Sequence, residues 1–450
     1  MAEKDPSQRV VITGMGVMAP TPRGTHVDGF WQDLINNEHG IRPITDILEG
    51  YTDIIKTRIG APLKEFDLKT VLEAEGFDVN DPNIKKEQRN WHRCAQAVVW
   101  SGALALRQAD LLQGNSLRIN ERQVSPVNLG VYEGTGIGGT LTLVELQKIL
   151  DEHETDGRVK PFHMLNMLPG RVDEVPAIVF NAKAFNDTML TECAAGLSSI
   201  DRAVDELRLG RAKVVLAGGV ETAAHPATIV AFERLRALNL SSEEEYKKNP
   251  KPFSVDPGGL VLGEGAGQVV LETLEHALWR QQKLGARVTI LAEVLGTGKS
   301  SDAVHDTFPS KDGAGRAIDK ALADAGLEPG EVNNLYVNAH ATATNGDALE
   351  FMSVAERFQP DQVRGISTIK SHTGHTFGAA GTLGVITGVK SLHTGVMPAN
   401  RNLHEPLPET EGWEMLPNEP KRVESVDMVE VNAFGFGGKN RVAFLGKVKG

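Results

Sequence analysis

Strand-like and helix-like segments alternate along the whole chain. This alternation constrains the fold most, because it is typical of layered α/β proteins. The predicted strands are Arg9–Thr13, Val127–Glu133, Lys213–Ala217, Gln268–Glu272, Val288–Leu295, Asn334–Asn338, Asp427–Asn432 and Arg441–Leu445. The predicted helices are Asp28–Asn36, Trp91–Ala109, Leu141–Glu152, Ala195–Arg208, Gly313–Ala325 and Ala379–His393.

The order of these segments indicates an internal duplication. In the first half, a strand runs into the glycine-rich loop 134–139, a helix begins just after Cys193, and two strands follow. In the second half, a strand ends at His340, a Gly/Ala-rich helix follows the segment Thr368–His375, and two strands close the chain. We therefore predict two similar halves, 1–280 and 281–450, with Cys193 and His375 at equivalent helix starts.

The charge balance and the cysteine content limit the possible partners and compartments. The chain has 450 residues, with 47 Lys and Arg against 59 Asp and Glu, and its net charge of −12 argues against nucleic-acid binding. No apolar run approaches the ~20 residues that span a bilayer, and the N-terminus lacks the apolar segment of a signal peptide. Only two cysteines, Cys94 and Cys193, favour a reducing compartment. We expect a cytoplasmic protein without a membrane segment.

Cys193 lies just before a predicted amphipathic helix, in the segment Leu190–Ser199. A thiol at a helix N-terminus is close to unpaired N–H groups and to the positive end of the helix dipole, and both favour the reactive thiolate. The alternative is a buried and inert cysteine, which is common. This segment alone leaves both interpretations open.

Two histidines follow in positions suited to catalysis. His340 ends an apolar strand, and His375 lies in Lys370-Ser-His-Thr-Gly-His, before a segment rich in Gly and Ala. His372 and His375 also form an H-x-x-H pair, but metal-binding pairs on helices are usually spaced i, i+4, and Gly374 interrupts a regular helix. We therefore expect no metal. Lys370 follows an apolar segment, so partial burial with a carboxylate partner such as Glu350 is plausible.

Two glycine-rich loops match a dinucleotide-binding pattern only superficially. Gly134-x-Gly-x-x-Gly139 is not followed by a second strand that carries an acidic residue, and Gly14-x-Gly-x-x-Ala19 runs into Pro20 and Pro22. We expect no nicotinamide cofactor.

Taken together, these motifs resemble the condensing enzymes of the thiolase superfamily, specifically the elongating β-ketoacyl–acyl carrier protein synthases. The resemblance covers almost the whole chain, from Arg9–Gly16 through Leu260–Gly267 and Lys370–Gly381 to Asn432–Asn440. It implies a duplicated α-β-α-β-α fold with two mixed five-stranded sheets. It also implies a decarboxylative Claisen condensation in fatty-acid or polyketide biosynthesis.

The resemblance assigns roles to individual residues. Cys193, His340 and His375 match the Cys-His-His catalytic site, and Lys370 and Glu350 match a buried charged pair that orders it. The backbone N–H groups of Cys193 and Phe434 would hold the oxyanion, and Phe434 matches a gating phenylalanine. The residues that match the acyl or pantetheine pocket are Ile137, Thr342, Thr344, Gly435 and Phe436.

The resemblance also implies partners. The substrates would arrive on the phosphopantetheine of an acyl carrier protein, with no cofactor bound tightly to the chain itself. Thiolase-type enzymes are dimers, and both a homodimer and a heterodimer with a related ketosynthase subunit are open. The residues that match the carrier-protein docking region are Lys86, Arg89, Arg158, Lys160 and Arg236.

Several positions depart from the pattern of the fatty-acid enzymes. Glu192 precedes the nucleophile where small or neutral residues are usual, and it either raises the pKa of Cys193 or points away, toward a partner subunit. Ala341 and Gly384 replace a glycine and a glutamate, and Gly381–Ile386 is more similar to polyketide ketosynthases. A specialised polyketide or polyene synthase is therefore also open. So are a non-catalytic chain-length factor, against which Cys193 argues, and a thiolase-like enzyme, which would need a second cysteine in the site.

Overall fold

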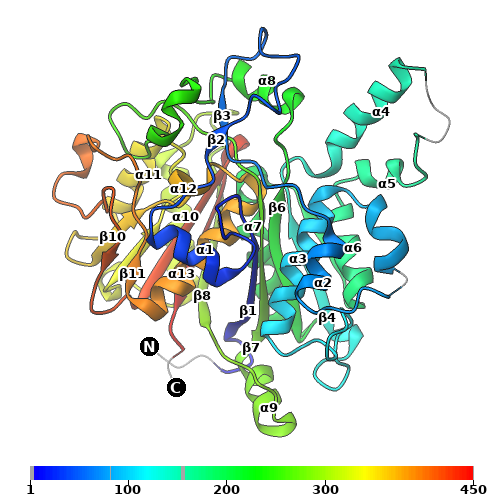
Figure 1. Cartoon of the computed structure of the whole chain (residues 1–450). Helices are drawn as coiled ribbons and strands as arrows, with labels where there is room; N and C mark the ends of the chain where they lie inside the picture. Colours follow the sequence, from blue (N-terminus) through cyan, green and yellow to red (C-terminus); the bar gives the residue numbers. More distant parts are fainter. Residues whose placement is uncertain (1–4, 82, 154–157, 449–450) are drawn as a thin grey trace.

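The chain forms one large mixed sheet in the computed structural model, which describes residues 5–81, 83–153 and 158–448 (Figure 1). Ten strands of the described residues follow one another across this sheet. In spatial order they are β10 (Val363–Ser367), β9 (Leu335–Asn338), β13 (Met428–Gly435), β14 (Lys439–Gly446), β8 (Ala292–Ser301), β1 (Val10–Met18), β7 (Gly265–Thr273), β6 (Val214–Glu221), β4 (Leu129–Gly134) and β5 (Asn186–Met189).

The expectation of two separate five-stranded sheets is corrected in one detail. The five strands of each half are present, but β1 of the first half pairs with β8 of the second. This antiparallel contact covers Val10–Ile12 and Ala292–Val294. Each of these strands would otherwise leave a row of backbone N–H and C=O groups unpaired at a buried edge, so the pairing joins the halves into one sheet.

Both halves have the same strand order. Counted along the chain within each half, the strands lie in the order third, second, fourth, fifth, first. A helix that begins near a predicted catalytic residue joins the third strand to the fourth in each case: α7 (Ala195–Arg208) after Cys193, and α13 (Ala380–Thr394) after His375. Residue 280 lies within α9 (Leu274–Leu284), which joins β7 to β8, and the division at that point stays a prediction.

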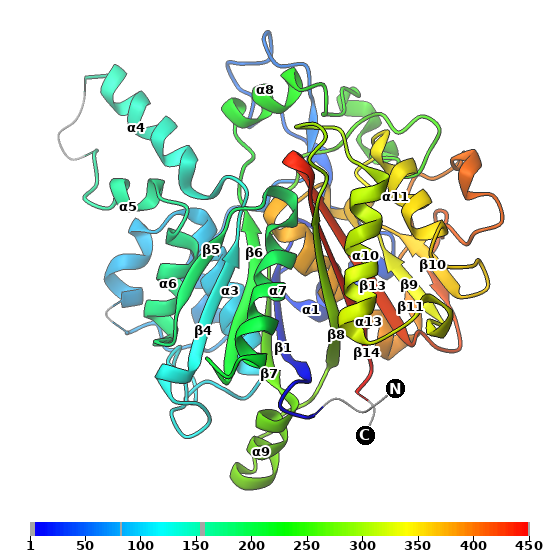
Figure 2. The same ribbon diagram turned by 180° about the vertical axis from the view of Figure 1, so that it is seen from behind.

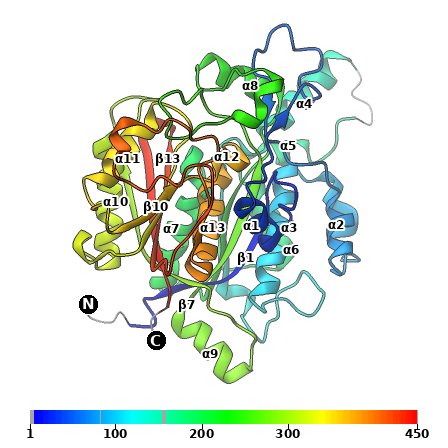
Figure 3. The same ribbon diagram turned by 60° about the vertical axis from the view of Figure 1, so that its left-hand side comes forward.

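The helices form three layers with the two halves of the sheet between them. Figure 3 shows α7 and α13 in the centre, between the two halves. On the outer faces, α3 (Arg93–Gln108) and α6 (Arg171–Phe180) cover the first half, and α10 (Lys311–Ala325) and α11 (Gly346–Ala355) cover the second (Figures 2 and 3). This is the predicted α-β-α-β-α layering.

The remaining elements lie around these layers. The helices are α1 (Val27–Ile35), α2 (Leu68–Ala74), α4 (Leu141–Asp151), α5 (His163–Met167), α8 (Pro226–Arg234) and α12 (Lys370–Thr373). Two small sheets pair β2 (Arg42–Pro43) with β3 (Ile59–Gly60) and β11 (Val396–Met397) with β12 (Lys421–Arg422). Figures 1 and 2 show α4 and α5 projecting from the first half. No helix of the described residues is long and apolar enough to cross a membrane.

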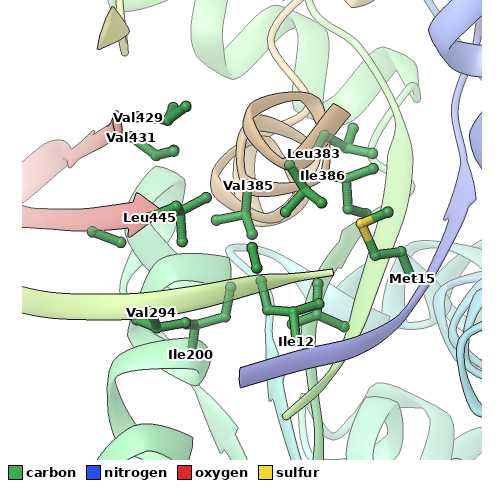
Figure 4. Close-up of a cluster of buried hydrophobic side chains, with 14 of the residues drawn as sticks. Ile12, Met15, Ile200, Val294, Leu383, Val385, Ile386, Val429, Val431 and Leu445 are labelled. Atoms are coloured by element: carbon green, nitrogen blue, oxygen red, sulfur yellow. The ribbon is translucent and has the colours of Figure 1, made fainter. Parts of the chain in front are cut away.

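The main core surrounds α13. Leu383, Val385 and Ile386 of this helix point in different directions and pack against side chains of both halves of the sheet and of α7 (Figure 4). Each fully buried side chain of this kind stabilises the fold by roughly 1.5–3 kcal/mol. Gly384 allows the helix to approach β13 closely, because a Cβ there would lie 2.9 Å from Val431 Cγ1.

Three glycines meet where α7 and α13 begin. A Cβ at Gly219 would overlap the carbonyl oxygen of Gly378 and lie 2.9 Å from Cα of Gly196. We therefore expect Gly219→Ala to lower the free energy of unfolding by about 1–3 kcal/mol, because backbone must move to admit the methyl group. Denaturant unfolding measures the change. Gly330→Ala is the control, since no atom lies within 4 Å of a Cβ at that position. Equal stability of the two variants would contradict the close contact.

Candidate active site

The fold brings Cys193 and His375 together although they lie far apart in the sequence. Cys193 lies in the 3-10 turn Glu192–Ala194 that leads into α7. His375 follows Gly374, whose φ of +64° ends α12 and turns the chain toward α13. His375 Nε2 lies 3.0 Å from Cys193 Sγ, and the two residues are only 2% and 4% exposed. The thiol therefore has one close polar partner in a nearly closed site.

The backbone fixes the tautomer of His375. The N–H of Phe377 points at Nδ1 of the ring at 3.3 Å, and a backbone N–H can only donate. Nδ1 therefore accepts, and Nε2 carries the hydrogen in the neutral ring. Burial, together with Lys370, holds the pKa of His375 well below its usual range, so the ring is neutral near pH 7. His375 Nε2–H is a hydrogen-bond donor directed at Sγ.

His340 lies beside this pair. Its ring centroid is 5.4 Å from that of His375 and 5.8 Å from that of Phe434. Burial, Lys370 and His375 hold the pKa of His340 well below its usual range, and its buried Nδ1 has no hydrogen-bond partner among the described residues. The site therefore holds two neutral imidazoles next to one thiol.

Lys370 and Glu350 both act on the backbone of His340. Lys370 Nζ donates to the carbonyl oxygen of His340, while the carboxylate of Glu350 accepts from the N–H groups of His340 and Ala341, both at 2.7 Å. The two buried side chains form no direct ion pair within the described part of the chain, but the charge of each acts on the other. That this charged pair orders the site stays a prediction. The two side chains hold His340 in place from both sides of its backbone.

Burial dominates the protonation of these groups. It raises the pKa of Glu350 to about 6 and lowers the pKa of Lys370 to about 8. Burial also raises the pKa of Cys193 to about 12; Lys370 opposes this shift, and Glu221 and Glu192 add to it. The resting thiol is therefore protonated, because loss of solvation disfavours the thiolate that the helix N-terminus favours.

The raised pKa of Glu350 predicts an acid limb in the pH profile of catalysis. Above about pH 6 the carboxylate is ionised and accepts both N–H groups, whereas below it one oxygen is protonated. We expect the turnover rate to fall as the pH decreases through about 6. Glu350→Gln should lower the turnover rate at pH 8 roughly tenfold. The amide NH₂ group would face one of the two backbone N–H groups, and two donors cannot form a hydrogen bond with each other. In the same variant, the turnover rate should no longer fall near pH 6. If it still falls there, the pH dependence arises from the titration of another group.

A cavity of about 460 Å³ leads to the thiol. It is bounded by Cys193, His340 and His375 and by the loop after β13. The other predicted site residues that line it are Glu350, Thr342, Thr344, Phe434, Gly435, Phe436 and Arg236. The hydroxyl groups of Thr342 and Thr344 lie 3.1 Å apart, so they form one polar patch on the wall. The predicted pocket residue Ile137 does not line this cavity.

Ile137 lies instead in the glycine-rich loop after β4, which wraps around a buried carboxylate. Glu221 accepts hydrogen bonds from the backbone N–H groups of Gly136 at 2.7 Å and of Ile137 and Gly138 at 3.1 Å. The N–H groups that would hold a phosphate in a dinucleotide-binding loop are therefore occupied. Glu221 at the end of β6 also lies near the thiol, whose pKa it helps to raise.

Among the predicted docking residues, Arg158 and Lys160 lie between α4 and α5 in the chain, and Arg236 follows α8. Figure 1 shows α4 and α8 at the same end of the molecule. Arg89, Arg158, Lys160 and Arg236 are exposed. Arg158 pairs with Glu152 at 2.5 Å, and Arg236 reaches the cavity. The side chain of Lys86 lies outside the described part of the chain. The docking role of these positions stays a prediction.

The sequence interpretation missed three residues that shape the site. Asp347 accepts from the N–H groups of Thr342 at 3.0 Å and Ala343 at 3.1 Å, and so fixes the loop after His340. Glu221 organises the glycine-rich loop, and Lys439 pairs with Glu192 at 2.7 Å. The Asn-Gly-Asp sequence at 345–347 is typical of a turn capped by a carboxylate. The contacts of Glu221 and Lys439 could not be predicted from the residues next to them in the sequence.

His372, the other half of the H-x-x-H pair, turns away from the thiol. Its Nε2 faces Asn37 Oδ1 at 3.4 Å. Within residues 5–81, 83–153 and 158–448, no group of three or more His, Cys, Asp or Glu side chains is placed to hold a metal ion.

The comparisons with known proteins agree with this geometry. The β-ketoacyl synthase N-terminal domain matches residues 7–277, and the β-ketoacyl synthase C-terminal domain matches residues 291–404. The chain belongs to the β-ketoacyl synthase family. The predicted family and the predicted class of enzyme, an acyltransferase of the condensing type, are thereby confirmed.

Individual relatives of this family match along nearly their whole length. The chain is 34% identical over 442 residues to 3-oxoacyl-[acyl-carrier-protein] synthase 2 of Vibrio cholerae, covering 96% of this chain and 97% of the relative. A solved β-ketoacyl synthase from Burkholderia phymatum superimposes with a TM-score of 0.83 at 28% identity, covering 98% of this chain and all of that one. The ishigamide ketosynthase/chain length factor gives 0.81 at 29% identity, covering 98% and 99%. These matches confirm the predicted fold class.

Proposed function

We propose that the protein condenses an acyl group held on Cys193 with a malonyl group held on a carrier protein, with loss of carbon dioxide. The observation that carries this proposal is the convergence of one thiol and two neutral imidazoles at the inner end of a cavity, with His375 Nε2 3.0 Å from Cys193 Sγ. Such a set can form a thioester and stabilise an enolate without a metal or a bound cofactor.

The first step is transfer of the acyl group. Cys193 Sγ attacks the thioester carbonyl of an acyl-phosphopantetheine, the bond from carbonyl carbon to the pantetheine sulfur breaks, and the thiol proton passes to that sulfur. Lys370, held against the His340 carbonyl, places its positive charge near the thiol and favours the loss of its proton. A covalent intermediate of this kind predicts ping-pong kinetics.

The second step is the condensation. The N–H groups of His340 and His375 hold the carbonyl oxygen of the malonyl thioester, the bond to the carboxyl carbon breaks, and its electron pair forms the enolate. The enolate carbon attacks the acyl-cysteine, and Sγ leaves. The oxyanion would be bound by the N–H groups of Cys193 and Phe434. Close approach of these segments supports this role, since a Cβ at Gly435 would lie 3.5 Å from Cys193 N.

The substrate carrier is an acyl carrier protein, as the names of the relatives state for those proteins. No cofactor bound tightly to this chain enters the reaction, because phosphopantetheine arrives on the carrier. The basic residues Arg89, Lys160 and Arg236 are exposed, and Arg236 lines the cavity, which supports a dock for an acidic partner despite the net charge. Both cysteines are free thiols, which supports a reducing, cytoplasmic location.

A dimer is the proposed assembly, formed along β5. This strand is an edge of the large sheet, so it can pair with a second copy or with a related subunit. Large apolar side chains are exposed on α4, on and just after α5, on α6, which packs against β5, and just after β5 itself. They are Leu143, Leu150, Met164, Leu168, Ile178 and Leu190. An exposed apolar face beside an open edge supports an interface.

A chain-length factor is the second candidate function, supported by the similarity to the ishigamide ketosynthase/chain length factor. The contact between Cys193 and His375 argues against it, because a subunit that only shapes a cavity needs no thiol held against an imidazole.

The proposal is tested by an elongation assay. Acyl-carrier proteins of different chain lengths are mixed with malonyl-carrier protein, and the β-ketoacyl product is detected by mass spectrometry. We expect product that depends on both substrates. Absence of product at every chain length, with folded protein and with a related partner subunit supplied, would overturn the proposal.

A further inference from the structure

An ion pair lies directly beside the nucleophile. Lys439 Nζ contacts both carboxylate oxygens of Glu192, at 2.7 and 2.9 Å, and lies 3.4 Å from the carbonyl oxygen of Leu190. Glu192 has a φ of +48°, an uncommon conformation for a residue other than glycine. The carboxylate thus holds a strained turn whose next residue is Cys193.

The lysine belongs to a different part of the site. Lys439 begins β14, directly after the loop 434–438, which includes the last two residues of β13. Its residues Phe434 and Phe436 line the cavity. This loop and the turn with Cys193 also touch through their backbones, because a Cβ at Gly435 would lie 2.9 Å from the carbonyl oxygen of Thr191. The ion pair therefore ties the turn to the C-terminal end of the loop that bounds the cavity.

The pair also changes the charge balance around the thiol. Lys370 and Glu221 act on the charge of Cys193 from other elements, and the two histidines of the site are neutral. Glu192 adds a second negative charge next to Glu221, and both disfavour the thiolate. Lys439 offsets the added charge.

We propose that Glu192 and Lys439 are positioning residues, which lock the turn of Cys193 against the loop 434–438 and cancel the negative charge that Glu192 brings to the thiol. The inference rests on the proposed role of Cys193 as the acyl acceptor. Lys439 of the same chain neutralises Glu192, the unusual acidic residue before the nucleophile. A second subunit is therefore not needed for this purpose.

The two halves of the pair have opposite effects on the thiol. Glu192→Gln removes the negative charge, and the alkylation rate of Cys193 by iodoacetamide at pH 8 should rise about three- to tenfold. Lys439→Gln leaves Glu192 uncompensated, and the rate should fall by a similar factor. Alkylation is followed at the peptide containing Cys193, and the pH profile should shift to lower pH in the first variant and to higher pH in the second. High salt should reduce both shifts, because the pair is partly exposed.

The positioning role has a separate readout. Both single variants should elongate about three- to tenfold more slowly, because the turn loses its tie to the loop. The reversed pair Glu192→Lys with Lys439→Glu should recover most of the rate, and Lys439→Arg should retain it. Lys421→Gln is the matched control, since it removes an exposed ion pair with Glu414 far from the thiol in the sequence and outside the cavity lining.

The outcomes separate this inference from the proposed function. Shifts of the alkylation profile in the same direction for both single variants, or no recovery in the reversed pair, would overturn the positioning role. Alkylation needs no acyl substrate, so opposite shifts in a protein that fails to elongate would support the pair and contradict the function. Melting temperatures verify that each variant is folded. If Glu192→Gln does not fold, Lys439→Gln compared with Lys439→Arg provides the test, because only the first of these two removes the charge.

Discussion

Replacement of Cys193 by alanine should abolish elongation, with a loss of at least about 1000-fold in turnover. The methyl group cannot form a thioester, and Cys193 is the cysteine that lines the cavity. The other cysteine, Cys94, is fully buried against Thr222, with its Sγ 3.0 Å from the hydroxyl oxygen. The measurement is the rate of β-ketoacyl product formation with saturating acyl- and malonyl-carrier proteins.

Cys94→Ala is the matched control for this prediction. Its thiol is fully buried and does not line the cavity, so elongation should stay within about threefold of the unmodified protein. A Cys193→Ala protein that still elongates at a comparable rate would contradict the assignment of the nucleophile.

Replacement of His375 by alanine should lower the rate of malonyl decarboxylation by about 100- to 1000-fold. The ring supplies one preorganised N–H donor to the carbonyl oxygen that becomes the enolate, and loss of one such donor has effects of this size. The fixed tautomer, with Phe377 N–H on Nδ1, gives the donor its direction. Release of carbon dioxide from malonyl-carrier protein measures this step independently of the acyl chain.

His372→Ala tests whether the effect is specific. This ring is buried in the same segment and faces Asn37, away from the thiol, so its loss should lower the melting temperature and leave decarboxylation per folded molecule within about threefold. Equal losses in both variants would assign the effect to packing of the segment and not to a hydrogen bond from His375.

The central strands of the sheet could be predicted from the sequence, whereas its outermost strands could not. β1, β6 and β7 are buried on both faces and read as apolar runs. The missed strands β5 and β10 are Asn-Asp-Thr-Met and Val-Arg-Gly-Ile-Ser, short edge strands without an apolar pattern. The helix α6 was also missed, because it contains Pro176, and a proline is typical of a position where a helix is interrupted. Edge elements are specified by tertiary pairing more than by local composition.

The proposed catalytic residues could be singled out in the sequence because each lies at a recognisable end of an element. Cys193 precedes a helix, and His340 follows a strand. The supporting contacts could not be predicted, since Lys439 and Glu192 lie 247 positions apart and meet only in the folded chain. Lys370 and Glu350 were predicted to be partners, but their arrangement was not predicted. Both side chains bind the backbone of His340 and do not bind each other.

Intact-mass measurement of the enzyme tests the central claim most directly. The protein is incubated with a panel of acyl-carrier proteins, and malonyl-carrier protein is added afterwards. The account predicts a mass gain equal to one acyl group, located on Cys193, and its loss after the second addition together with an extended β-ketoacyl product. A folded protein that gains no acyl group from any donor, or an acyl group on Cys193 that malonyl-carrier protein does not remove, would contradict it.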